Sequence, residues 1–106
     1  MSEYLPEVYK RFNADYPEVM AAFTELAKSA DSAGPLPARE RRLAKLGIAV
    51  GCESAGAVRS HARKALAEGI EPEAIRQVAV LAISTGGYPA AMAGYGWINE
   101  VLESER

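Results

Sequence analysis

The sequence predicts an all-α fold of about six helices in a single domain, residues 1–106. Alanine, the strongest helix former, accounts for 20 of the 106 residues, whereas valine, isoleucine and threonine together number 14 and are scattered. Apolar residues recur at spacings of three and four, and no stretch alternates between apolar and polar residues. The length suits one hydrophobic core.

The first third of the chain contains two amphipathic patterns. One ends near Asp15 and consists of Leu5, Val8, Tyr9 and Phe12. The other begins at Pro17, where proline suits the first turn of a helix, and consists of Val19, Phe23, Leu26, Ala27 and Ala30. It stops in the segment 31–35, which contains Gly34 and Pro35. We therefore expect two helices before a loop.

Two further helices are predicted in the middle of the chain. One starts near Pro37 and stops at Gly51, and because few residues after Lys45 are polar, we expect it to be buried on most sides. The next runs from about Glu53 to Glu68. It ends at a glycine suited to the left-handed position that follows a helix.

The last two helices are bounded by prolines and glycines. The fifth runs from Pro72 to the pair Gly86-Gly87 and is apolar nearly all round. The sixth begins at Pro89 and carries apolar residues to Leu102, and the polar tail 103–106 is expected to fray. Apolar faces beyond what one small domain can bury predict a homo-oligomer.

Composition excludes several classes of protein. One cysteine and one histidine rule out a disulfide framework and any metal site built from paired cysteines or histidines, so no metal is expected. A net charge of −2 argues against a nucleic-acid partner. No apolar run approaches the roughly 20 residues that cross a bilayer, and the first residues show no signal-peptide pattern. We expect no membrane partner and a cytoplasmic location.

His61 and Cys52 are the first candidates for chemistry. An imidazole exchanges protons near neutral pH, and His61 shares a helix face with Ser54; the alternative is a hydrogen-bonded structural histidine. Cys52 is predicted at a helix start, where the dipole favours a thiolate. The alternative for Cys52 is an inert small residue, because no second cysteine is present.

Charged residues and one glycine-containing loop complete the candidates. The run Arg39–Arg42 is either a solvated or intersubunit charge cluster or an anion site in which an arginine binds a carboxylate. Glu40 and Glu53 are either proton-transfer groups or surface acids. The loop 84–89, which contains Tyr88, is either a ligand-binding segment or a tight turn between helices.

Four segments carry a family resemblance: Leu36–Leu43, Gly51–Gly69, Glu71–Ile75 with its acidic helix opening, and the Gly-aromatic-Pro-Ala-Ala turn Gly87–Ala91. In this order they resemble the carboxymuconolactone decarboxylase family, which includes the AhpD-like alkylhydroperoxidases. The resemblance covers residues 36 to about 102. It implies an AhpD-like helical domain, assembled as a homotrimer or homohexamer, without an organic cofactor.

Redox members of that family carry the pattern C-x-x-C-x-x-x-H and a glutamate on the preceding helix. Aligned on His61, the two cysteine positions hold Ser54 and Ala57, and the glutamate position holds Arg42. Cys52 stands two positions before the first cysteine position. The resemblance therefore implies the decarboxylase-like branch, since peroxide reduction through a disulfide needs both thiols.

The leading hypothesis is a decarboxylase or related lyase acting on a small carboxylated lactone or acid. His61 is expected to act as general acid or base, Arg42 to contact the anion, with Arg59 as another possible contact, and Ser54 and Tyr88 to line the pocket. One alternative is an alkylhydroperoxidase that uses Cys52 with an external reductant. Another is a non-catalytic oligomeric member of the family, in which His61 is packed away from any cavity.

Overall fold

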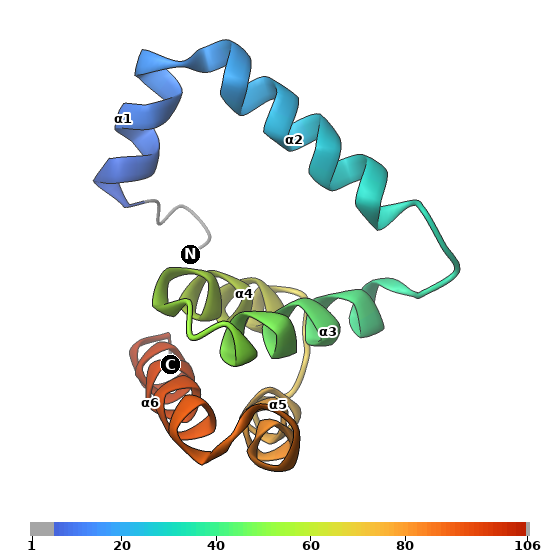
Figure 1. Cartoon of the computed structure of the whole chain (residues 1–106), viewed down its shortest axis with the longest axis vertical. Coiled ribbons are helices and arrows are strands. Elements are labelled where there is room, and N and C mark those ends of the chain that lie inside the picture. The colour runs from blue at the N-terminus through green and yellow to red at the C-terminus, as the bar shows by residue number, and fades with distance from the viewer. Residues whose placement is uncertain (1–5, 106) are drawn as a thin grey trace. The chain divides into compact units, whose positions relative to one another are not determined.

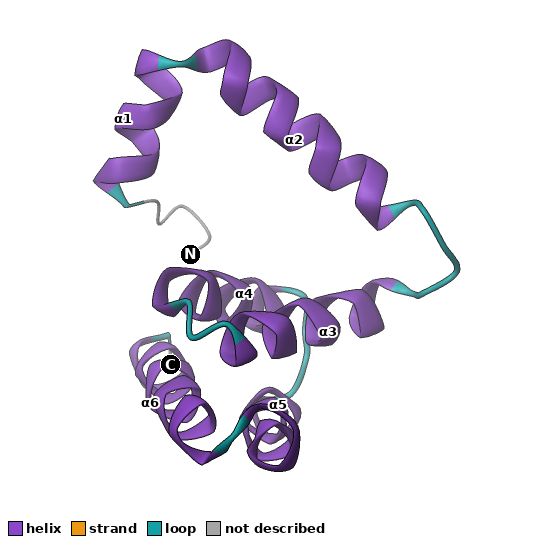
Figure 2. Ribbon diagram, viewed as in Figure 1, coloured by secondary structure: helices purple, strands orange, loops and turns teal. Residues whose placement is uncertain are grey.

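The computed structural model describes residues 6–105, and within them the chain forms six helices and no strand (Figures 1 and 2). The all-α fold class is thus confirmed. Leu5, predicted in the first helix, and Arg106, predicted in the tail, lie outside the described residues. The helices are α1 (Glu7–Asp15), α2 (Pro17–Asp31), α3 (Ala38–Gly51), α4 (Ala55–Ala67), α5 (Pro72–Gly86) and α6 (Tyr88–Ser104).

The helices divide between two compact units, residues 6–36 and residues 37–105. The first unit holds α1 and α2, which pack against each other and contain no buried residue. The rings of Phe12 and Tyr16 lie 5.5 Å apart at the junction of these two helices. The second unit holds α3 to α6. The single domain expected from the length stays a prediction.

Helix boundaries follow the proline and glycine signals closely. Proline occupies the first turn of α2, α5 and α6, where its missing N–H costs no helical hydrogen bond. α4 begins two residues later than predicted, because Glu53 has a φ of 54° and belongs to the turn before the helix. α6 continues to Ser104, into the tail expected to fray, and the Ser104 hydroxyl donates a hydrogen bond to the Val101 carbonyl at 3.2 Å.

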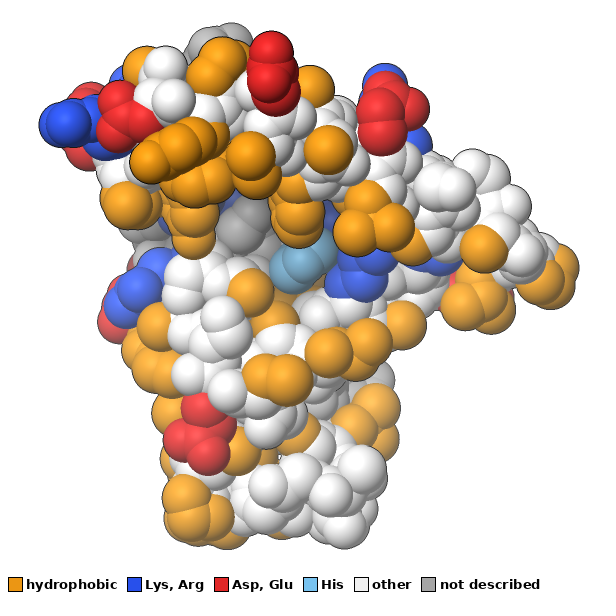
Figure 3. Space-filling model, turned by 45° about the horizontal axis from the view of Figure 1, so that its top comes forward, with side chains coloured by type: hydrophobic (Ala, Val, Ile, Leu, Met, Phe, Trp, Pro, Cys, Tyr) orange, Lys and Arg blue, Asp and Glu red, His pale blue; other side chains and the backbone are white. Residues whose placement is uncertain are grey.

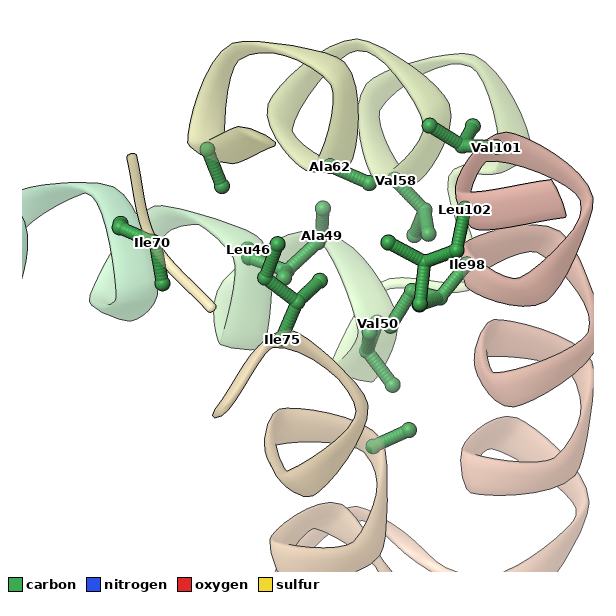
Figure 4. Close-up of a cluster of buried hydrophobic side chains, with 12 residues drawn as sticks. Leu46, Ala49, Val50, Val58, Ala62, Ile70, Ile75, Ile98, Val101 and Leu102 are labelled. Atoms are coloured by element: carbon green, nitrogen blue, oxygen red, sulfur yellow. The ribbon is translucent and has the colours of Figure 1, made fainter. Parts of the chain in front are cut away.

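A core of aliphatic side chains joins α3, α4, α5 and α6, as Figure 4 shows. Every pair of these helices is in contact. The core consists of Leu46, Ala49, Val50, Val58, Ala62, Ala65, Ile70, Ile75, Ala79, Ile98, Val101 and Leu102. Several are alanines, which let the helix backbones approach closely and leave little room for repacking.

The closest approach is between α6 and α3 at Gly94. A Cβ atom placed on Gly94 would lie 2.8 Å and 2.9 Å from the two γ-carbons of Val50, well inside van der Waals contact. Val50 is fully buried, so its side chain has no empty space into which it could move. The glycine thus sets how closely these two helices pack.

The four-helix unit leaves apolar side chains of α3 and α5 exposed. Ile48 on α3 is 66 % exposed and Leu81 on α5 is 61 % exposed. The expectation that the third helix is buried on most sides is therefore wrong for a single chain, because the core covers only the face of Leu46, Ala49 and Val50. The expected homo-oligomer stays a prediction. No helix in residues 6–105 combines the length and apolar character needed to cross a membrane.

Candidate functional site

His61 and Arg42 lie together at the edge of the α3–α4 contact. Both helices turn an apolar stripe toward the core, with Leu46 on α3 and Val58 on α4. Arg42 precedes Leu46 by four residues, and His61 follows Val58 by three, so each side chain borders its own stripe. Helix packing thus brings two residues 19 positions apart within reach. The Arg42 Nη1 atom lies 2.8 Å from the His61 Nδ1 atom.

Glu68 completes the cluster from the end of α4. It follows His61 by seven residues, about two helical turns, and therefore lies on the same side of the helix. Arg42 Nε donates to one carboxylate oxygen of Glu68 at 3.0 Å, and Nη2 donates to the other at 2.8 Å. The side chain of Arg42 is only 17 % exposed. All three guanidinium nitrogens are therefore engaged, two with Glu68 and one with His61.

The contact with Arg42 fixes the proton arrangement of the imidazole. Arginine carries donors only, so the Nδ1 atom of His61 must accept the hydrogen bond. The ring is then neutral and carries its proton on Nε2. His61 is half-buried, and Figure 3 shows the pale-blue imidazole at the surface beside blue Lys and Arg side chains. An Nε2–H donor next to cations suits contact with an anionic ligand.

The surroundings keep His61 neutral over a wide pH range. Burial, together with the charges of Arg42, Lys64 and Lys45, lowers the pKa of His61 to about 4, against a smaller raising effect of Glu68. The hydrogen bond from Arg42 holds the pKa of Glu68 below its usual range. At neutral pH the cluster thus contains a neutral imidazole, a carboxylate and three cations.

A neutral, half-buried histidine makes stability depend on pH. The unfolded chain binds a proton at His61 below about pH 6.5, whereas folded His61, whose pKa is lowered to about 4, stays neutral until the pH approaches 4. The contribution of neutral His61 to the free energy of unfolding is therefore fully present above pH 6.5 and is lost as pH falls toward 4. Between about pH 7 and about pH 5 the free energy of unfolding should fall by about 1 kcal/mol, after allowance for solvent screening. Urea denaturation at the two pH values measures this change.

The matched control for this pH dependence is His61→Gln, which removes the titrating ring and keeps a polar side chain. Its free energy of unfolding should change less over the same interval. Glu68 and Glu71 also have lowered pKa values, but their effect on stability is lost mainly below this interval. Equal slopes for wild type and variant would contradict a lowered pKa of His61.

Ser54 and Tyr88, the other predicted site residues, lie at the starts of helices. Ser54 precedes α4, is exposed, and makes no side-chain capping hydrogen bond. It lies on the same face of α4 as His61, about two turns away. Tyr88 is the first residue of α6 and is 63 % exposed. Within residues 6–105, neither side chain hydrogen-bonds to Arg42 or His61, and both stay predictions as ligand contacts.

Cys52 occupies a different helix end from the one predicted. It is exposed and follows the last residue of α3, and its backbone N–H donates to the Ile48 carbonyl at 2.9 Å. The expectation of a helix start at Cys52 is therefore wrong, because Glu53 adopts a positive φ and delays α4 to Ala55.

The remaining charged candidates point elsewhere. Arg59, the other proposed anion contact, pairs with Glu100 at 3.0 Å and lies over the Trp97 ring at 5.9 Å. It thus serves the contact between α4 and α6. Arg39, in the basic run, holds Glu71 at 3.0 Å and 3.4 Å from two of its nitrogens, which makes it a surface ion pair.

Glu68 is the site residue that sequence reasoning missed. The sequence pattern identified Glu68 only as the last residue of a predicted helix. Its partner Arg42 lies 26 residues earlier in the chain, on another helix. One signal was available. The spacing of seven from His61 places a carboxylate on the histidine's own face, on the side where the basic run of α3 supplies partners.

Comparison with known families gives one match. The model of the "Carboxymuconolactone decarboxylase family" matches residues 17–100, most of the chain, and so includes α2 as well as α3 to α6. The match therefore extends further toward the N-terminus than the segments that carry the resemblance. No curated protein and no solved structure matches this chain.

Proposed function

The chain belongs to the carboxymuconolactone decarboxylase family, and on this basis we propose that it is a cofactor-free decarboxylase or related lyase. Its substrate is a small carboxylated lactone or a related acid. The observation that supports this proposal most is the Arg42–His61 contact at 2.8 Å, at a half-buried site that basic side chains surround. Such a site combines attraction for a carboxylate with a hydrogen-bond donor for the reacting part of the substrate.

Charge supports binding of an acid at this cluster. Arg42, Lys45 and Lys64 all lower the pKa of His61, and among the described residues Glu68 is the carboxylate that opposes them. Arg42 has five N–H donors, and after its bonds to Glu68 and His61 one N–H remains on Nη1 and one on Nη2. These two donors are the proposed anion contact. Ser54 and Tyr88 remain the proposed polar lining.

A decarboxylation at this site needs few protein groups. The bond between carbon and the carboxylate breaks, CO₂ leaves, and the electron pair passes to a conjugated carbonyl oxygen of the lactone. The cations beside the imidazole of His61, which are Arg42, Lys45 and Lys64, stabilise the negative charge on that oxygen. His61 faces the reacting centre in this proposal, since its Nε2–H is the edge of the ring that Arg42 does not use.

The exposed apolar side chains of α3 and α5 support the proposed homo-oligomer, a trimer or hexamer. Exposure to water of three of these side chains, Ile48, Val80 and Leu81, is unfavourable, and their burial between copies of the chain would be favourable. Size-exclusion chromatography with light scattering measures the oligomer, and a monomer at micromolar concentration would contradict it.

Turnover of carboxymuconolactone by the purified protein tests the function directly. We expect CO₂ release and loss of the lactone's ultraviolet absorbance, at rates proportional to protein concentration and without added metal or cofactor. A parallel incubation with an organic hydroperoxide and a thiol reductant tests the peroxidase alternative through Cys52. Peroxide consumption without CO₂ release from any carboxylated lactone offered would overturn the proposal.

A further inference from the structure

We propose that Glu68 is a positioning residue: its carboxylate fixes the Arg42 guanidinium, which holds His61 as the Nε2–H tautomer, a neutral hydrogen-bond donor toward the substrate. The assignment of Glu68 and of the tautomer rests on geometry alone. The part that concerns the substrate rests on the proposed function. Glu68 therefore acts on the reaction through two other side chains, without touching the reacting atoms.

The bidentate contact determines where the guanidinium lies. An arginine side chain has four rotatable bonds, and a single hydrogen bond would leave its plane free to turn. Two parallel bonds, from Nε at 3.0 Å and Nη2 at 2.8 Å, fix both the position and the plane of the group. The third nitrogen, Nη1, is then directed at His61 Nδ1, at 2.8 Å. Without Glu68, nothing in this set holds Nη1 at that position.

Charge keeps the ring neutral, and the Arg42 contact selects the tautomer. The charges of Lys45 of α3 and Lys64 of α4 disfavour the doubly protonated ring, and a proton on Nδ1 would face the N–H of Arg42. Glu68 is the carboxylate that acts on the ring, and both its oxygens already accept from Arg42. The groups on both helices therefore favour a ring whose Nδ1 lone pair is occupied and whose proton is on Nε2.

This arrangement changes the chemistry available to His61. A base needs a free lone pair, and the one on Nδ1 is occupied; an imidazolium acid is scarcely populated at neutral pH, since the pKa is about 4. A neutral imidazole still donates a strong hydrogen bond to an oxygen that gains charge. In the proposed decarboxylation, Nε2–H stabilises the enolate oxygen while CO₂ leaves, and water then supplies the proton to carbon.

Nitrogen NMR of the histidine ring tests the positioning role, since the chain has one histidine and the spectrum holds one imidazole. In ¹⁵N-histidine-labelled protein near pH 7, we expect Nδ1 unprotonated and Nε2 protonated. Glu68→Ala should give a mixture of the two tautomers, because Arg42 is released. Arg42→Met should give the same change by removing the donor itself. Circular dichroism establishes that each variant is folded.

Glu71→Ala is the matched control. Arg39 lies on the same helix as Arg42 and donates two hydrogen bonds to Glu71, from Nη1 at 3.0 Å and Nη2 at 3.4 Å, and within residues 6–105 this pair makes no hydrogen bond to His61. The tautomer should therefore stay as in wild type, even though an ion pair is lost. If Glu68 had only a structural role, Glu68→Ala and Glu71→Ala would both lower the free energy of unfolding and would both leave the tautomer of His61 unchanged. Rescue by Glu68→Asp, which restores a carboxylate, should return part of the Nε2–H signal.

The outcomes separate this inference from the proposed function. A protonated Nδ1 in wild type, or an unchanged tautomer in folded Glu68→Ala, would overturn the inference whether or not the protein turns over a lactone. The expected spectra without turnover would uphold the positioning of His61 and remove its role toward that substrate. With turnover, Glu68→Ala should lower kcat by about 10-fold and change KM little.

Discussion

Replacing His61 with alanine is expected to lower kcat for decarboxylation by about 100-fold or more. This is the range typically lost when one hydrogen-bond donor to a developing oxyanion is removed. The Arg42–Glu68 ion pair remains in this variant, so binding of the carboxylate and hence KM should change less than kcat. Steady-state kinetics on purified wild type and variant, compared at saturating lactone, measure the effect.

Two controls define what the alanine variant has lost. His61→Gln offers an amide N–H near the position of Nε2–H, and should keep more activity than alanine if the ring is a neutral donor. Free imidazole added to His61→Ala should restore part of kcat, because His61 reaches the surface. Full activity of the alanine variant would exclude His61 from the reaction. A glutamine variant as inactive as alanine would favour proton transfer over hydrogen bonding.

Replacing Gly94 with alanine is expected to lower the free energy of unfolding by about 2–3 kcal/mol. The added methyl group would overlap both γ-carbons of Val50, which is fully buried and packed among alanines and aliphatic residues. Relief requires α6 to move away from α3, and this overpacking outweighs the better helix propensity of alanine. Urea denaturation at neutral pH, followed by circular dichroism, measures the loss.

Gly96→Ala provides the matched control on the same helix. Among the described residues, and apart from its chain neighbours and the backbone of its own helix, no atom lies within 4 Å of a Cβ placed there, so the change should be neutral or stabilise by up to about 1 kcal/mol. Val50→Ala should cost less in the Gly94→Ala variant than in wild type, since the double variant removes the overlapping carbons. Equal stabilities for the Gly94 and Gly96 variants would show that the close contact does not limit the packing.

The helices were predictable because proline and glycine mark their ends. Pro17 and Pro72 start α2 and α5 as the sequence predicted, and Gly51 and Gly86 end α3 and α5. These signals act within one turn of the chain and need no tertiary context. Glu53 shows the limit: nothing in its residue type indicates a positive φ, and the boundary of α4 shifted with it.

The candidate site was predictable in part. Alignment with the family pattern pointed to His61 and Arg42, and the structure joins them at 2.8 Å. The bond between them was not predictable, because it depends on how α3 and α4 pack. The same holds for Glu68, whose partner lies 26 residues away. Cross-helix pairs of this kind follow from tertiary packing, whereas sequence periodicity gives only the face of each helix.

A single residue, Gly87, separates α5 from α6, and its φ of 99° is open to glycine at little cost. The two helices pack against each other directly after this turn. Bringing them together therefore closes the shortest of the loops among α3 to α6 and costs little chain entropy. Contacts of such low sequence separation form early and quickly when a chain folds. The α5–α6 hairpin is thus where we expect folding of this unit to begin, before the contact of α3 with α4 brings Arg42 to His61.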